Sequence, residues 1–72
     1  MENKIDVNLI EYLSKKVHEA WAEEKHKQGI FNHPDDIPYG ELADNIKEYD
    51  RVTVRTVLKG LSQYFDLVTK GN

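Results

Sequence analysis

The side chains best placed to do chemistry are Arg51 and Arg55, which follow Asp50 at the predicted start of the last helix. The first turn of a helix carries positive potential, so two cations there are unfavourable unless an anion lies beside them. Free backbone amides, the hydroxyls of Thr53 and Thr56, and two guanidinium groups together suit a phosphate or a carboxylate. The alternative is internal neutralisation by the carboxylates just upstream, which are Asp44, Glu48 and Asp50. The sequence leaves both interpretations open.

Aromatic residues give a second indication of a binding site. Four of them fall at the end of the first predicted helix, in the loop that follows it and just before the last helix: Trp21, Phe31, Tyr39 and Tyr49. Such rings either belong to the core or meet around one cleft. Aromatic rings beside an anion site suit a nucleotide, whose base stacks on a ring while its phosphate meets arginine.

Other kinds of chemistry find little support in the residues. The three histidines, His18, His26 and His33, lack the paired spacing of a zinc motif, and the chain has no cysteine. Neither Ser14 nor Ser62 lies in a recognisable nucleophile motif. We therefore expect no catalytic residues, no metal and no cofactor, and a protein that is not an enzyme.

Length and charge restrict the organisation further. The 72 residues allow one domain, residues 1–72, with a thin core that a second copy could complete. The net charge is −3, but the first fifty residues carry twelve acidic side chains and six lysines, whereas the remainder carries four basic side chains and one acidic. No apolar run is long enough for a membrane span or a signal peptide. We expect a cytoplasmic protein without a membrane partner.

The spacing of apolar residues predicts a mainly α fold made of two long packed helices joined by a loop and a short helix. Apolar steps of three and four predict the first helix over residues 7–28, with Gly29 as its stop. Both prolines fall in the predicted loop, residues 29–40, and a short helix is expected over 41–48. The last helix is predicted from Asp50, as its cap, to Tyr64 or Phe65. Alternation at residues 65–68 leaves room for a minimal strand pairing near the C-terminus.

Several segments resemble the ryanodine-receptor (RyR) domain, in the form of a single short repeat of bacterial or phage type. The segments that carry this resemblance are His-Glu-Ala-Trp-Ala at 18–22, Gln-Gly at 28–29, His-Pro-Asp-Asp-Ile-Pro-Tyr-Gly-Glu-Leu at 33–42 and Lys-Glu-Tyr-Asp-Arg at 47–51. The resemblance implies a mainly helical fold. It also implies pairing of repeats with adenine nucleotides between them, so a homodimer or higher homo-oligomer is expected here. In this family a Trp usually follows the Gln-Gly; here Ile30 stands in its place, the loop is shortened, and Phe31 is the candidate substitute.

The leading hypothesis is thus a small, non-catalytic sensor or sequestering protein that binds a nucleotide or another phosphate-bearing small molecule. The candidate ligand-binding residues come from both the residue chemistry and the resemblance: Trp21, Lys25, Phe31, His33, Tyr39, Tyr49, Arg51 and Arg55. One alternative is a winged helix-turn-helix repressor of GntR type, although the net charge of −3 disfavours nucleic acid as a partner. A structural or oligomerisation module is the other.

Overall fold

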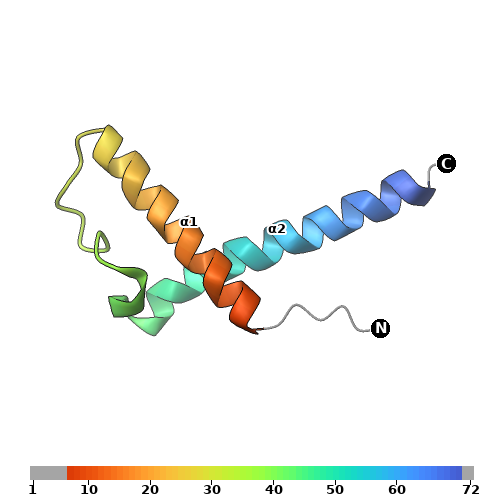
Figure 1. Cartoon of the computed structure of the whole chain (residues 1–72), viewed down its shortest axis with the longest axis horizontal. Helices are drawn as coiled ribbons and strands as arrows, with labels where there is room; N and C mark the ends of the chain where they lie inside the picture. Colours follow the sequence, from red (N-terminus) through yellow and green to blue (C-terminus); the bar gives the residue numbers. More distant parts are fainter. Residues whose placement is uncertain (1–6, 71–72) are drawn as a thin grey trace.

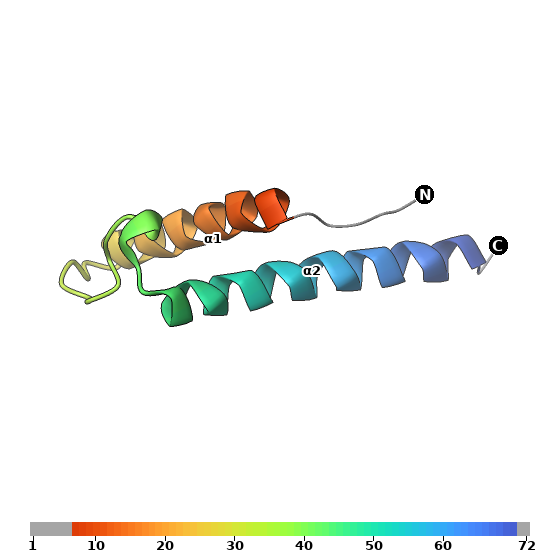
Figure 2. The same ribbon diagram turned by 90° about the horizontal axis from the view of Figure 1, so that it is seen from below.

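The structure is a computed structural model that describes residues 7–70. It contains two long helices, α1 (Val7–Lys27) and α2 (Asp44–Lys70), with a short 3-10 helix, η1 (Tyr39–Glu41), before α2. The two helices cross at an angle, and α2 continues far beyond the crossing (Figure 1). Seen from below, they form two layers, with the loop closing one end (Figure 2). No strand occurs in residues 7–70, so the prediction of a mainly α fold is confirmed.

The end of α1 follows the prediction closely. Gly29 adopts a left-handed conformation with φ of 82°, which glycine reaches without the steric penalty of a Cβ. The amide of Ile30 donates to the carbonyl of Lys25 over 2.9 Å, and the amide of Gly29 donates to that of His26 over 3.0 Å. These bonds satisfy carbonyls that the last turn of a helix leaves without partners. The glycine therefore turns the chain out of α1 and into the loop.

The predicted break between a short helix and a last helix is absent. The amides of Ile46 and Lys47 both donate to the carbonyl of Ala43 over 3.0 Å, and α2 then runs without interruption from Asp44. The prediction that Asp50 caps a helix is therefore wrong, because Asp50 lies in the second turn of α2. No glycine or proline falls between residues 44 and 59, so each backbone amide can continue the helical ladder.

The other end of α2 also differs from the expectation. The helix continues to Lys70, past the predicted end at Tyr64 or Phe65. Residues 65–68, which alternate in the manner of a strand, are helical, and that prediction is wrong. A single strand has no neighbouring strand to receive its backbone hydrogen bonds, whereas a helix satisfies them within itself.

The core lies where the two helices cross and where η1 packs against α1. Only a few side chains are buried there, and they are four apolar or aromatic residues and two polar ones: Ile10, Tyr39, Leu42, Val54, Ser14 and His18. Most of the large apolar residues in the last four turns of α2 are exposed. The packed part of the described chain is thus the crossing and the loop, and the far half of α2 projects from it.

Candidate functional site

The site is built around His18, a buried residue in the middle of α1 that is only 5% exposed. Its Nε2 donates a hydrogen bond of 2.7 Å to the carbonyl oxygen of Ile37 in the loop. A carbonyl can only accept, so Nε2 carries a proton, and Nδ1 lies 4.0 Å from the carboxylate of Asp50, with which it forms an ion pair when Nδ1 is protonated as well. His18 therefore joins the loop, α1 and α2 at one point.

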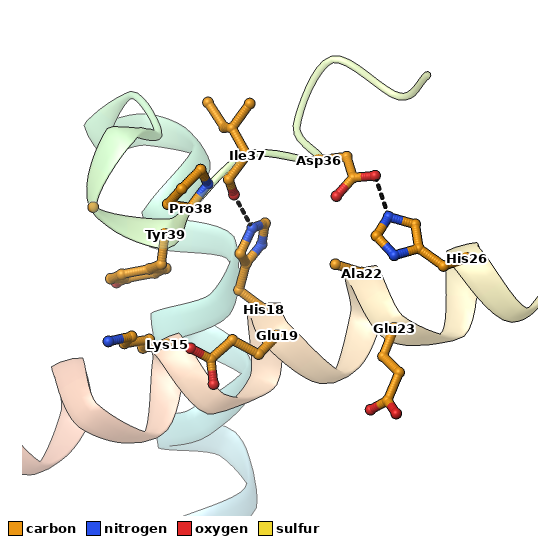
Figure 3. Close-up of a pocket in the computed structure, with 11 residues that line it drawn as sticks. Lys15, His18, Glu19, Ala22, Glu23, His26, Asp36, Ile37, Pro38 and Tyr39 are labelled. Carbon is orange, nitrogen blue, oxygen red and sulfur yellow. Dashed lines mark hydrogen bonds and ion pairs between the residues drawn. The ribbon is translucent and has the colours of Figure 1, made fainter. Parts of the chain in front are cut away.

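A second histidine strengthens the attachment of the loop to α1. Figure 3 shows His18 and His26 extending from α1 toward the segment that carries Asp36 and Ile37. His26 Nε2 donates to Asp36 Oδ2 over 2.5 Å, and Phe31 stacks on the His26 ring at a centroid distance of 5.1 Å. The two histidines are eight residues apart, which places both on the same side of the helix. This spacing is the feature of the sequence that indicates a shared contact with the loop.

A cleft opens on the other side of His18, between the end of α1, the loop and the first turns of α2. It has a volume of about 250 Å³, and its lining is aromatic, imidazole and carboxylate in character, with one apolar residue: His18, Trp21, His33, Asp35, Ile46, Tyr49 and Asp50. We call it the Trp21–Tyr49 cleft. The structure thus brings together Trp21, His33 and Tyr49, three of the predicted ligand-binding residues.

Aromatic contacts hold the inner wall of the Trp21–Tyr49 cleft in place. The Trp21 ring stacks with His18 at a centroid distance of 5.5 Å and meets the edge of His33 at 5.0 Å. Lys25 lies one turn further along α1, with its Nζ 5.6 Å from the centre of the Trp21 ring. Tyr49 is 73% exposed and stands at the rim. The cleft therefore has a fixed ring inside, an accessible ring outside and a cation nearby.

Two carboxylates give the Trp21–Tyr49 cleft its polarity. Burial raises the pKa of Asp50, the negative charge of Asp35 raises it further, and His18 acts in the opposite direction. The amide of Asp35 donates to Nδ1 of His33 over 3.0 Å, which leaves the proton of a neutral His33 ring on Nε2. A partly buried carboxylate is stabilised by N–H donors, so this lining favours a ligand that brings them.

The predicted position of Arg51 and Arg55 at a helix start is wrong, because α2 begins at Asp44. Arg51 instead connects α1 to α2. Its Nε donates to Glu11 over 2.6 Å, and its Nη1 donates to Asp44 over 3.1 Å and to Glu48 over 3.3 Å. Arg55 donates to Glu48 over 2.5 Å. Both guanidinium groups thus have the internal carboxylate partners that the sequence left as an alternative.

Glu11 is the residue of this network that the sequence did not single out. The hydrogen bond from Arg51 lowers its pKa, and the hydroxyl of Tyr39 contributes by donating to it over 3.0 Å. Burial and the charge of Glu11 in turn raise the pKa of Tyr39. Tyr39 therefore serves the packing between η1 and α1, and it lies outside the lining of the Trp21–Tyr49 cleft.

Among residues 7–70, no group of three or more His, Asp or Glu side chains is placed to hold a metal ion together. Neither described helix combines the length and the apolar character that crossing a membrane requires. No family model matches the chain, and neither a curated protein nor a solved structure matches it. The resemblance to the RyR domain therefore stays a prediction.

Proposed function

We propose that this protein is a small, non-catalytic binding module that takes a nucleotide, or a similar phosphate-bearing signal, with its base in the Trp21–Tyr49 cleft. The observation that carries the proposal is the juxtaposition of two aromatic side chains with the carboxylates of Asp35 and Asp50 in one cleft. Aromatic faces stack on any base, and carboxylates accept hydrogen bonds from the amino groups at a base edge.

The role of the cations in this proposal differs from the one that the sequence predicted. Arg51 and Arg55 are engaged by carboxylates, so the proposal assigns the phosphate contact to Lys25. Its ammonium group lies over the Trp21 ring, 5.6 Å from the ring centre. The proposal requires this flexible side chain to swing aside when a base stacks on Trp21 and to meet the phosphate there. One lysine gives a weaker phosphate contact than two arginines, and we therefore expect the base to dominate recognition.

The first test uses the position of the tryptophan. Trp21 is the only tryptophan of the chain, so a base that stacks on it changes the whole tryptophan fluorescence signal. Adenine and guanine nucleotides, cyclic nucleotides and ADP-ribose derivatives are titrated, and thermal unfolding is followed with the same ligands. The proposal predicts saturable quenching and a rise in Tm for at least one of them. If none produces either effect at millimolar concentration, the proposal is wrong.

A pair of tyrosine variants makes the test specific to the cleft. Tyr49→Ala removes the exposed ring at its rim and is expected to weaken binding about fivefold or more, since stacking on one base contributes roughly 1–3 kcal/mol. Tyr12→Ala is the matched control, because Tyr12 is an exposed tyrosine of α1 outside the cleft lining. Equal affinity of the two variants would show that the ligand binds elsewhere.

The winged-helix alternative receives no comparable support. It requires a turn between two helices within residues 41–53 and a wing at the C-terminal end. Residues 44–70 instead form the single helix α2. The alternative of an oligomerisation module rests on a different part of α2 and is developed next.

A further inference from the structure

The half of α2 that projects beyond the crossing carries large apolar side chains that nothing in the described chain covers. They are 46–69% exposed: Val57, Leu61, Tyr64, Phe65, Leu67 and Val68. In Figure 1 this half extends away from α1 and the loop, toward the C-terminal end. At 1.5 Å per residue, the 27 residues of α2 measure about 40 Å, and the part beyond the crossing has no packing partner among residues 7–70.

The exposed residues are arranged in a pattern that favours another helix. Val57, Leu61, Tyr64 and Val68 follow one another at steps of four, three and four, which places them on one face, and the buried Val54 precedes them on that face. Leu58 and Phe65 widen that face. The only charged residues between positions 56 and 69 are Lys59 and Asp66, which are seven apart and share the opposite face. The face is therefore apolar and uncharged along four turns.

A groove continues this face onto the packed part of the molecule. It has a volume of about 280 Å³ and is lined by residues of α1 and α2 that are almost entirely apolar in the surface they present: Leu13, Lys16, Val17, Thr53, Val54, Val57 and Leu58. The molecule thus combines an open apolar groove near the crossing with a projecting apolar helix end. Two features of this kind on one chain are complementary to those of a second copy.

We propose that two copies of this chain associate through antiparallel pairing of the projecting halves of α2. The symmetry axis passes near residues 62 and 63, so that Leu61 packs beside the partner's Tyr64. Val57 then packs beside the partner's Val68, and the last turn of each α2 lies in the groove of the other copy. The two helix dipoles run in opposite directions, which favours this orientation over a parallel one.

The area available agrees with a second copy as the occupant. Half-exposed Val, Leu, Phe and Tyr side chains each leave on the order of 100 Å² in solvent. The five of them on this face therefore offer roughly 500 Å² per copy: Val57, Leu61, Tyr64, Phe65 and Val68. Two copies together then bury about 1,000 Å² in total, which is the lower limit for a specific interface. Among residues 7–70, Ile10, Tyr39, Leu42 and Val54 are the buried apolar residues, so the dimer gives α2 a cover that the described part of its own chain does not provide.

The test compares two glutamate substitutions in the same turn of α2. Leu61→Glu places a charge at the centre of the apolar face, and Gln63→Glu places the same charge on the opposite face. The molar mass is measured by sedimentation equilibrium over a roughly 100-fold range of concentration. Wild type and Gln63→Glu are expected at twice the mass of one chain, and Leu61→Glu is expected to dissociate at least tenfold more readily. The proposal is wrong if the wild type is a monomer at every concentration, whether or not the chain binds lipid vesicles or another protein. It is also wrong if Leu61→Glu leaves a dimer intact.

Disulfide trapping tests the orientation and does not depend on Leu61→Glu remaining folded. The chain has no cysteine, so Val57→Cys and Val68→Cys each introduce a single thiol. Antiparallel pairing predicts a cross-linked product in an oxidised equal mixture of the two variants and little in either alone. In each variant alone the two thiols lie roughly 16 Å apart along the helix axis. Cross-linking of each variant with itself, or no mixed product, contradicts the antiparallel pairing.

Discussion

Tyr39→Phe removes a single hydroxyl from the contact between η1 and α1. Tyr39 is buried, and its hydroxyl donates to Oε1 of Glu11 over 3.0 Å. Phenylalanine retains the ring, which lies 6.2 Å from the His18 ring and 5.4 Å from Nζ of Lys47. The effect of the substitution therefore reports the hydrogen bond to the carboxylate.

The expected loss of stability in Tyr39→Phe depends on the hydrogen bonds that Glu11 retains. A hydrogen bond to a charged acceptor contributes roughly 1.5 to 3 kcal/mol to stability. Glu11 retains Arg51 as a donor at 2.6 Å, so its carboxylate is not left without a partner. We therefore expect the lower end, a loss of about 1.5 kcal/mol in the free energy of unfolding. In a domain of this size that loss lowers Tm by roughly 6–12 °C.

The assay is thermal and urea unfolding followed by circular dichroism, with Tyr12→Phe as the matched control. Tyr12 is exposed, and Tyr12→Phe is expected to leave Tm unchanged. The pKa of Glu11 is lowered in the folded state, so its contribution is complete above the ordinary glutamate value of 4.5 and is lost as the pH falls through the folded value. The difference between wild type and Tyr39→Phe should thus shrink as the pH falls below 4.5. A Tm loss no larger than that of Tyr12→Phe at neutral pH would refute the reasoning.

Three further predictions concern the carboxylate of the cleft, the glycines and the core. Burial raises the pKa of Asp50, so the ionised carboxylate at pH 7 lowers the stability of the folded state. Asp50→Asn should therefore raise Tm at pH 7. The gain should shrink at lower pH, where Asp50 in the wild type becomes protonated. Gly29→Ala should lower the free energy of unfolding, measured with urea, by about 1 kcal/mol, because φ at Gly29 is 82°. Gly60 lies within α2 with open space around it, so Gly60→Ala should raise the free energy of unfolding by roughly 0.5–1 kcal/mol. Leu42→Ala should cost about 2–4 kcal/mol by the same measurement, against less than about 0.5 kcal/mol for the exposed Leu67→Ala.

The fold was largely accessible from local sequence patterns, and the errors share one cause. Apolar spacing and Gly29 place α1 within one residue of its observed end. The break predicted before Asp50 and the strand predicted at 65–68 both depended on single local signals, namely a capping residue and a short alternation. Such signals are weak beside the continuity of backbone hydrogen bonds, which extends α2 from Asp44 to Lys70.

The candidate site was accessible only in part. Residue type identified Trp21 and Tyr49, and the resemblance to the RyR domain added His33; the structure brings all three into one cleft. The contacts that connect distant positions were not accessible, since nothing in the local sequence indicates that Glu11 lies beside Arg51, forty residues away. The direction of an arginine side chain depends on which carboxylates the tertiary fold brings within reach.

The sequence by itself determined two amphipathic helices, a glycine stop and a loop rich in aromatic and acidic residues, because these depend on periodicity and backbone preference. The tertiary structure decided which charges neutralise one another and where a cleft opens. It also decided how far α2 projects beyond the crossing. Those features depend on where two helices cross, which is set by contacts between residues far apart in the chain. The exposed apolar face of α2 exists because the crossing lies near one end of that helix (Figure 1).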